Sequence, residues 1–394
     1  MTGIDLAVLT AMTRRGRLPV ATADAIAVAT ASAMSWVLHR TVAAAGDPFL
    51  RWVDKPGAFL GTALVTGGID VAVVARASGS KRTNQARLLA AKALALGVAG
   101  GLRVLAYRVA LVGETRRTMG VRSCRPAPAG DLRLSVVVPA FGEADRIASS
   151  VRRLQEALAT VDGAGGIEVL VVDDGSRDAT ADRARAAGAR VIRLPSNRGK
   201  GAAVREGMLA ARGRTVAFVD ADLAYPPEQL LLLLAEVEGG WDVAVGSRRL
   251  PGSSGQAGTS VLRAVSGRMF NVLTALVLLG HYRDTQCGCK ALRGDVARLI
   301  FSQTRLDGFA FDVEVIHLVE RYRLSLTEVP VTLVEAAGST VRVSVDAMRM
   351  VADLFRVRRW SGQGRYDLEA DPATVLAAAA PGFPADGASA TAIR

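Results

Sequence analysis

The sequence of 394 residues has few of the side chains that build disulfide frameworks or soft-metal centres. Its only cysteines are Cys124, Cys287 and Cys289, and its three histidines are scattered along the chain. Three cysteines cannot form a disulfide scaffold, and Cys287 and Cys289 do not have the spacing of a zinc site. The sequence therefore predicts no thiolate or histidine metal centre. Reduced thiols fit a catalytic domain that faces the cytosol.

Aromatic residues and negative charges are also scarce. Only 5% of the residues are aromatic although 50% are hydrophobic, and the mean hydropathy of +0.26 is high for a soluble enzyme. The 49 Lys and Arg residues outnumber the 37 Asp and Glu residues, which gives a net charge of +12. This surplus suits anionic partners such as phosphates or acidic membrane lipids. Because the chain lacks interleaved aromatic and basic residues, we expect no nucleic-acid partner.

No long apolar run in the first 113 residues is free of charge. Leu18–Leu38, Gly57–Ala75 and Leu88–Gly113 nevertheless have about the 20 residues that a membrane-spanning helix needs. Small residues permit close helix packing in lipid, and charges within such helices usually face the bundle interior. We therefore expect transmembrane helices, with a soluble Ala-rich helical domain as the alternative. The interrupting charges are Asp24, Asp70, Lys92, Arg103 and Arg108.

Two helix ends in this region are related to each other. They are Ser35-Trp36-Val37-Leu38-His39-Arg40 and Arg103-Val104-Leu105-Ala106-Tyr107-Arg108. This pair resembles the helix ends of GtrA-like small membrane proteins, a family linked to moving lipid-linked sugars across membranes. The resemblance implies that residues 1–113 are GtrA-like helices that either anchor the protein or carry lipid-linked sugar. Because the first helix would begin part-way along, at Thr2, we expect a truncated first span or a misassigned start codon.

From Leu132 onward, short β-branched runs alternate with helical runs. This alternation predicts an α/β domain with a doubly wound, mostly parallel sheet. We expect a linker at 114–130, the α/β domain at 131–360 and a disordered tail at 361–394. The predicted strands are Leu134–Val138, Ile167–Val172, Val191–Leu194, Val216–Val219 and Val243–Gly246. The predicted helices are Ile147–Leu158, a helix capped by Ser176 that runs to Ala187, Ala202–Ala211 and Gln229–Val237.

Pairs of carboxylates follow two of the predicted strands. Asp173 and Asp174 precede Gly175, and Asp220-Ala221-Asp222 follows the fourth strand. In open α/β sheets, ligands bind at the carboxyl ends of strands. Asp220 and Asp222 can hold a hard cation such as Mg²⁺ or Mn²⁺, which would neutralise a diphosphate leaving group. Either motif alone also fits an ordinary acidic turn, but the two together favour a site.

Two further loops carry groups that suit a nucleotide. Pro139-Ala140-Phe141-Gly142-Glu143 ends the first strand, where an aromatic ring and an acid can grip a nucleoside. Asn197-Arg198-Gly199-Lys200-Gly201 follows the third strand, and its glycines and cations can approach a phosphate. This second loop lacks the spacing of a P-loop, which argues against an ATPase of that class.

Together these motifs resemble family 2 glycosyltransferases with the GT-A fold. The resemblance extends from about Leu132 to Arg359. Within the family, this region is most similar to the dolichyl-phosphate β-glucosyltransferases, which are close kin of the polyprenyl-phosphate mannosyltransferases. The further motifs are Asp284-Thr285-Gln286-Cys287-Gly288 with Lys290, Phe311-Asp312-Val313-Glu314, Glu328-Val329-Pro330-Val331 and Gly338-Ser339.

The resemblance implies a metal-dependent enzyme that transfers a hexose from a nucleotide sugar to a dolichyl or polyprenyl phosphate. One in-line attack would invert the anomeric centre and give a β product. UDP-glucose is the favoured donor, with GDP-mannose as the alternative. The implied nucleoside contacts are Pro139, Phe141, Glu143 and Asp174, with Asp173 and Lys200 nearby, and the implied diphosphate and metal contacts are Asp220, Ala221, Asp222 and Arg248.

The acceptor site is expected in the second half of the domain. A lipid phosphate is already negatively charged, so its attack on the sugar needs no general base. Arg263 and Arg268 precede the apolar Met269–Leu279 and can bind the lipid phosphate, or they lie on a solvated helix face. Asp284, Gln286, Asp312 and Glu314 are the other candidates for this site.

Two other functions remain as alternatives. A processive polysaccharide synthase would need a Gln-x-x-Arg-Trp element, which Arg358-Arg359-Trp360 does not complete. A pure lipid-sugar transport or anchoring module would not need the donor-site residues. We therefore expect a multi-pass cell-membrane enzyme with a cytoplasmic catalytic domain.

Overall fold

The computed structural model describes two compact units, Met1–Thr115 and Arg116–Arg394. The boundary lies close to the predicted end of the N-terminal region at residue 113. The described residues are 22–30, 32, 56–78, 90, 92–95, 97–99, 101–102, 119–123, 125–161, 166–248, 250–251, 253, 274, 287–334 and 343–378.

The described part of the first unit is helical and includes α3 (Pro56–Ser78). Three of its charged residues meet in its interior: Lys92 Nζ lies 2.6 Å from both Asp24 Oδ1 and Asp70 Oδ2, and all three side chains are buried. Within the described ranges, no helix combines the length and the hydropathy that a membrane crossing needs. The paired helix ends 35–40 and 103–108 lie outside the described residues.

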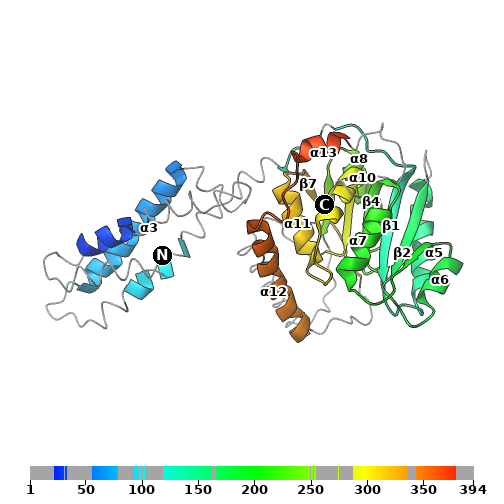
Figure 1. The fold of residues 1–394 in the computed structure, drawn as a ribbon, viewed down its shortest axis with the longest axis horizontal. Helices are drawn as coiled ribbons and strands as arrows, with labels where there is room; N and C mark the ends of the chain where they lie inside the picture. Colours follow the sequence, from blue (N-terminus) through cyan, green and yellow to red (C-terminus); the bar gives the residue numbers. More distant parts are fainter. Residues whose placement is uncertain are drawn as a thin grey trace. The chain divides into compact units, whose positions relative to one another are not determined.

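A seven-stranded mixed sheet forms the centre of the second unit, in the order β3-β2-β1-β4-β6-β5-β7 (Figure 1). The pairs β1–β2, β1–β4, β2–β3 and β5–β7 are parallel, whereas β6 is antiparallel to both β4 and β5. The strands are β1 (Leu132–Ala140), β2 (Ile167–Asp173), β3 (Arg190–Arg193), β4 (Gly213–Val219), β5 (Val243–Ser247), β6 (Cys289–Arg293) and β7 (Leu326–Pro330).

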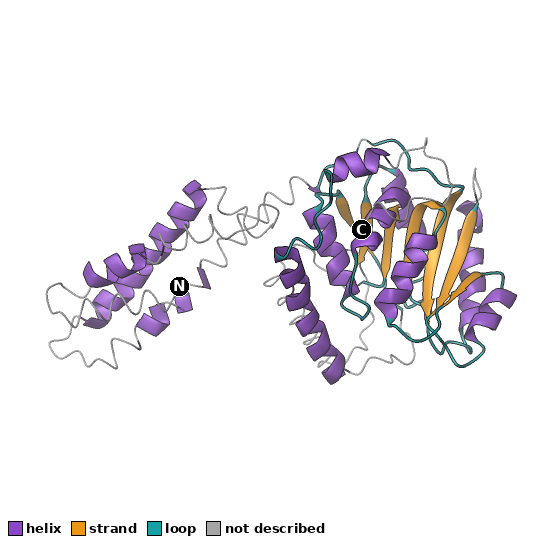
Figure 2. Ribbon diagram, viewed as in Figure 1, coloured by secondary structure: helices purple, strands orange, loops and turns teal. Residues whose placement is uncertain are grey.

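Helices cover both faces of this sheet (Figure 2). Alternate residues of β1 enter opposite hydrophobic clusters, because successive side chains of a strand point to opposite faces: Val137 packs with α7, α10 and α11, and Val136 packs with α5, α6 and α8. The helices are α5 (Ile147–Leu158), followed by the short 3₁₀ turn Ala159–Val161, α6 (Thr180–Ala186), α7 (Lys200–Ala210), α8 (Gln229–Glu238), α10 (Gly294–Gln303), α11 (Phe311–Arg321), α12 (Val343–Gly362) and α13 (Pro372–Ala378).

The predicted strands and helices of the first half of the domain are present, with one local difference at the start of α6. Helix α6 begins at Thr180, and Ser176 does not cap it; the Ser176 hydroxyl instead accepts a hydrogen bond from the Gly142 amide at 2.9 Å. Strand β6 was not predicted, because its run is short and carries Lys290 and Arg293. The sheet is therefore mixed at this position.

The predicted linker and tail also differ from the structure. Met119 is buried in the main hydrophobic cluster, and Arg125 contacts Asp242 and Asp295, so both residues are part of the second unit rather than of a linker. Tyr366 and Leu376 are buried in the same cluster, so the prediction of disorder was wrong for 361–378. These two apolar side chains supply the buried surface that a disordered segment lacks. Residues 379–394 lie outside the described residues.

Candidate donor and metal site

The carboxyl ends of β1, β2 and β4 bring the predicted donor-site loops to one edge of the sheet. Strands β1 and β2 are in register with Ala140 opposite Asp173, and β4 pairs on the other side of β1. Because the three strands are parallel, the segments 139–143, 173–176 and 220–222 all leave the sheet at this edge. The sequence predicted this convergence, since each motif directly follows an apolar run.

The loop after β1 presents an aromatic ring to solvent and is held in place by two hydrogen bonds. The Phe141 side chain is 53% exposed, which is unusual for phenylalanine beside a buried strand. The Gly142 amide donates to Ser176 Oγ, and the Glu143 amide donates to Thr180 Oγ1, both at 2.9 Å. A fixed, exposed ring at a strand end can stack on a planar base.

Two buried acidic residues, Asp173 and Asp174, accept hydrogen bonds from the loops of this region. Asp174 Oδ1 and Oδ2 accept hydrogen bonds from the Arg198 and Gly199 amides, both at 2.8 Å. Asp174 thus holds the loop 197–201 against the end of β2, and burial raises its pKa despite these donors. Asp173 is buried and accepts from the Ser176 amide at 3.0 Å. The structure therefore gives both acids a role in positioning loops.

Glu143 lies beside the carboxylate pair. It contacts Arg146 at 2.8 Å, while burial and the nearby Asp222 and Asp178 raise its pKa above the ordinary value, with Arg146 acting in the opposite direction. Asp222 and Glu143 are therefore close enough to influence each other, although they come from different strands.

Asp220 and Asp222 sit on a tight turn after β4. Leu223 has a φ of +49°, a left-handed conformation that costs energy for a residue with a branched side chain. The turn is closed by a hydrogen bond from the Leu223 amide to the Asp220 carbonyl at 3.0 Å. The Ala221 carbonyl accepts from Ser150 Oγ at 2.6 Å, which ties the turn to α5. A strained residue therefore lies directly after the two carboxylates, as is common at ligand sites.

Asp220 and Asp222 are the pair of carboxylates at this edge that suits a hard cation, because Asp174 uses both of its oxygens to accept from backbone amides. Within the described residues, no group of three or more His, Cys, Asp or Glu side chains is arranged to hold a metal. Two carboxylates and the oxygens of a diphosphate are nevertheless a donor set that Mg²⁺ accepts. The residues present thus fit a cation that arrives together with a phosphate ligand.

Two lysines provide the positive charge of the site. Lys200 Nζ lies 2.5 Å from Asp220 Oδ1. Lys290, fully buried in β6, donates to Asp312 Oδ1 at 2.5 Å and to the Cys287 carbonyl at 2.7 Å. Burial lowers the pKa of Lys200, but the carboxylates of Asp220 and Asp312 outweigh it and raise the pKa overall. The lysines and acids therefore form one charge network.

The comparisons with known proteins agree with this arrangement. Residues 135–301 match the model of Glycosyl transferase family 2. A dolichyl-phosphate beta-glucosyltransferase of Drosophila melanogaster is 37% identical over 263 residues, which cover 62% of this chain and 79% of that protein. The chain belongs to glycosyl transferase family 2. The Homo sapiens dolichyl-phosphate beta-glucosyltransferase is 32% identical over 257 residues, which cover 60% of this glycosyltransferase and 78% of the human protein.

A solved structure gives a more distant likeness. Glucosyl-3-phosphoglycerate synthase from Mycobacterium tuberculosis, crystallised with Mn²⁺, UDP and glucosyl-3-phosphoglycerate, is 21% identical with a TM-score of 0.46. The match covers 63% of this glycosyltransferase and 84% of that chain. A likeness of this extent carries no conclusion about what this glycosyltransferase binds.

The structure separates two of the predicted acceptor residues. Asp312 and Glu314 lie two positions apart on α11 and therefore on different sides of the helix. Asp312 faces Lys290, whereas Glu314 accepts hydrogen bonds from the Leu306 amide at 2.8 Å and the Tyr366 hydroxyl at 2.6 Å. Glu314 thus fixes a loop and the C-terminal segment, and its geometry does not support the predicted acceptor contact.

The remaining predicted residues divide into two groups. Arg248 is exposed just after the end of β5. Arg263, Arg268, Asp284 and Gln286 lie outside the described residues. No role was predicted for Lys290, which is buried and paired with Asp312. The signal for such a cation is a lysine within an apolar run.

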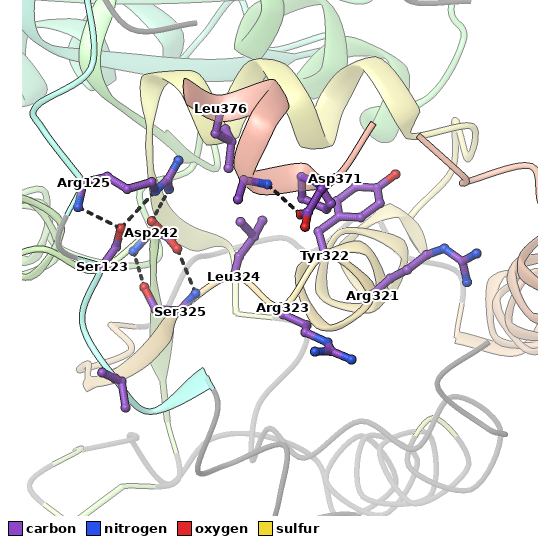
Figure 3. Close-up of a pocket in the computed structure, with 13 residues that line it drawn as sticks. Ser123, Arg125, Asp242, Arg321, Tyr322, Arg323, Leu324, Ser325, Asp371 and Leu376 are labelled. Atoms are coloured by element: carbon purple, nitrogen blue, oxygen red, sulfur yellow. Dashed lines mark hydrogen bonds and ion pairs between the residues drawn. The ribbon is translucent and has the colours of Figure 1, made fainter. Parts of the chain in front are cut away.

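A cavity of about 580 Å³ lies away from the donor site (Figure 3). Its lining includes Asp242 and Ser325, which directly precede β5 and β7, so it is at the opposite edge of the sheet. Figure 3 shows Ser123, Arg125, Asp242 and Ser325 joined on one side. The Asp242 amide donates to Ser325 Oγ, and Asp242 Oδ2 accepts from the Ser325 amide, both at 2.9 Å. These contacts attach the segment after the N-terminal unit to the catalytic core.

Proposed function

We propose that this glycosyltransferase has a GT-A fold and transfers a hexose, with UDP-glucose favoured, to a dolichyl or polyprenyl phosphate. Inversion at the anomeric carbon gives a lipid-phosphate β-sugar. The observation that carries the proposal is the 37% identity to a dolichyl-phosphate beta-glucosyltransferase over 79% of that protein. GDP-mannose is the alternative donor.

The donor half of the site supports this reaction. Asp220 and Asp222 would hold Mg²⁺ or Mn²⁺, and the bound ion would neutralise the diphosphate leaving group. The exposed Phe141 ring would stack on the base, and the loop held by Asp174 would lie beside the phosphates. Arg248, at the end of β5, would contact a phosphate oxygen.

The acceptor half needs cations and shape rather than a general base, because the attacking lipid phosphate is already ionised. Arg263 and Arg268 would bind that phosphate, and Asp284 and Gln286 would contribute to the sugar pocket. Asp312 borders the pocket through its fixed contact with Lys290. A buried pair of this kind keeps a carboxylate in one orientation.

The N-terminal unit would serve as a GtrA-like membrane anchor. The enzyme would then be a multi-pass protein of the cell membrane with a cytoplasmic catalytic unit and membrane lipids as partners. This arrangement brings the active site to a lipid acceptor. Transport of lipid-linked sugar by the same helices is the second candidate, suggested by the sequence likeness of their ends to GtrA-like proteins.

The test is sugar transfer by membranes that contain the full chain. Labelled UDP-glucose and labelled GDP-mannose are supplied separately and in competition, and lipid-bound label is measured after extraction. We expect acid-labile glucosyl lipid that depends on added dolichyl or polyprenyl phosphate. A preference for GDP-mannose would overturn the donor assignment, and label in a polymer rather than in lipid would overturn the acceptor assignment.

A further inference from the structure

We propose that Lys200 neutralises the Asp220 carboxylate in the cation-free site and moves away from it when a divalent cation binds there. This exchange would make binding of the cation depend on arrival of the diphosphate. The inference rests on the proposed function, because it assumes that Asp220 and Asp222 hold the cation.

The two oxygens of Asp220 have different surroundings. Oδ2 lies close to Gly288: a Cβ atom added to Gly288 would come within 2.4 Å of this oxygen. Oδ1 points to Lys200, whose Nζ lies 2.5 Å away. Oδ1 is itself shielded from solvent and has no hydrogen bond of good geometry within the described part of the chain. The contact between Lys200 and Asp220 is therefore a close ion pair.

A divalent cation cannot share this oxygen with the ammonium group. Mg²⁺ binds carboxylate oxygens at about 2.1 Å. An ammonium nitrogen at 2.5 Å from the same oxygen would then lie beside the metal and repel it. The Asp220 side chain is 30% exposed although Oδ1 is shielded, so solvent reaches the carboxylate on its Oδ2 side. A cation that binds there still lies next to the Lys200 ammonium group, whose charge opposes it.

The position of Lys200 in the fold allows this movement. Lys200 is the first residue of α7 and follows Gly199, whose φ of +107° only glycine adopts readily. Gly199 and Gly201 pack so tightly on residues 306–308 that the backbone is fixed there. The side chain alone can therefore turn. Asp312 also acts on Lys200, but it is already held by Lys290, so the phosphate oxygens of the donor are the natural new partner.

Binding of Mn²⁺ to the full-length protein tests the exchange without any sugar transfer. Free Mn²⁺ is followed by electron paramagnetic resonance, with and without UDP, for the unmodified protein and for Lys200→Met. We expect weak Mn²⁺ binding that UDP strengthens. In Lys200→Met, Mn²⁺ alone should bind at least about tenfold more tightly, and the gain from UDP should shrink.

Two controls accompany this variant. Lys200→Arg keeps the charge and should keep Mn²⁺ binding weak. Arg185→Gln removes an exposed cation that pairs with Asp182 on α6 and should leave Mn²⁺ affinity unchanged. Unchanged or weaker Mn²⁺ binding in Lys200→Met, with normal thermal unfolding, would overturn the exchange. Mn²⁺ binding that survives Asp222→Asn would instead show that the cation is held elsewhere and that the proposed metal site is wrong.

Discussion

Single carboxylates in this enzyme have distinct tasks although they share one edge of the sheet. Both oxygens of Asp174 hold backbone amides of a loop, while Asp222 uses one oxygen to accept from the Ala224 amide at 3.1 Å. Asp222 is half-buried and keeps its second oxygen for a ligand. Loss of Asp174 should disorder a loop, whereas loss of Asp222 should mainly remove a cation ligand.

Asp222→Asn should lower the transfer rate by at least about 100-fold, because one of two metal ligands loses its charge. The measurement is lipid-bound label from UDP-glucose over a range of Mg²⁺ and Mn²⁺ concentrations. Asp182→Asn, at an exposed ion pair on α6, is the control and should behave as the unmodified enzyme. Undiminished transfer in excess EDTA by the unmodified enzyme would contradict the metal requirement.

His317 should make stability depend on pH. Its ring is buried, and neither ring nitrogen has a hydrogen-bond partner within the described residues. Burial, assisted by Arg321 and Arg358, lowers the pKa of His317 to about 3. Between that pH and the ordinary pKa of about 6.5, the unfolded chain binds a proton that the folded chain does not. Stability therefore falls as the pH is lowered through this window, by up to about 1.4 kcal/mol per pH unit.

The variant His317→Leu isolates this effect. Between pH 7 and pH 5, the melting temperature of the unmodified protein should fall by about 4–8 °C more than that of His317→Leu. The reason is that the variant lacks about 2 kcal/mol of proton-linked destabilisation. Thermal unfolding at both pH values measures the difference. Identical pH dependence in the two proteins would show that the ring is not held neutral by burial.

At the scale of elements, the C-terminal segment closes the core beside α11. The Tyr366 side chain is fully buried and donates to Glu314, and its carbonyl accepts from the Tyr322 hydroxyl at 2.8 Å. Arg321 contacts both Asp367 and Ser361. The segment thus stabilises α11, the helix whose other side presents Asp312 to the site.

Tyr366→Phe should lower the free energy of unfolding by about 1.5–3 kcal/mol, since a buried carboxylate loses a donor. Tyr322→Phe loses a bond to a neutral carbonyl and should cost about 0.5–1.5 kcal/mol. Thermal unfolding ranks the two, and transfer activity below the melting temperature should be retained in both. If Tyr366→Phe lost activity without losing stability, the result would instead indicate that Glu314 belongs to the acceptor site.

At the scale of the whole molecule, the chemistry lies in the second unit. All described donor-site residues follow Leu132, yet Met119 and Arg125 are built into the core of the same unit. A catalytic unit cut near Gly130 would lose these contacts. A truncated protein that keeps an intact catalytic unit should therefore begin before residue 119.

A variant that lacks residues 1–115 should transfer glucose to a short-chain, detergent-soluble lipid phosphate at a rate within about tenfold of the full chain. The measurement is labelled lipid product in detergent. A second variant that begins at Gly130 is the matched comparison and should be less stable, because Arg125 no longer pairs with Asp242 and Asp295. Inactivity of a folded 116–394 variant would show that the N-terminal helices form part of the acceptor site.

The sequence alone determined the alternation of strands and helices and the location of the donor-site motifs. Both are local: apolar β-branched runs form buried strands, and the residues that follow parallel strands converge at one edge. The tertiary structure decided what depends on contacts between distant residues. In the folded chain, β6 lies between β4 and β5, Glu314 and Asp312 lie on different sides of α11, and the segment around Tyr366 packs into the core. Each of these outcomes depends on contacts between segments that are not adjacent in the sequence, and local periodicity does not encode such contacts.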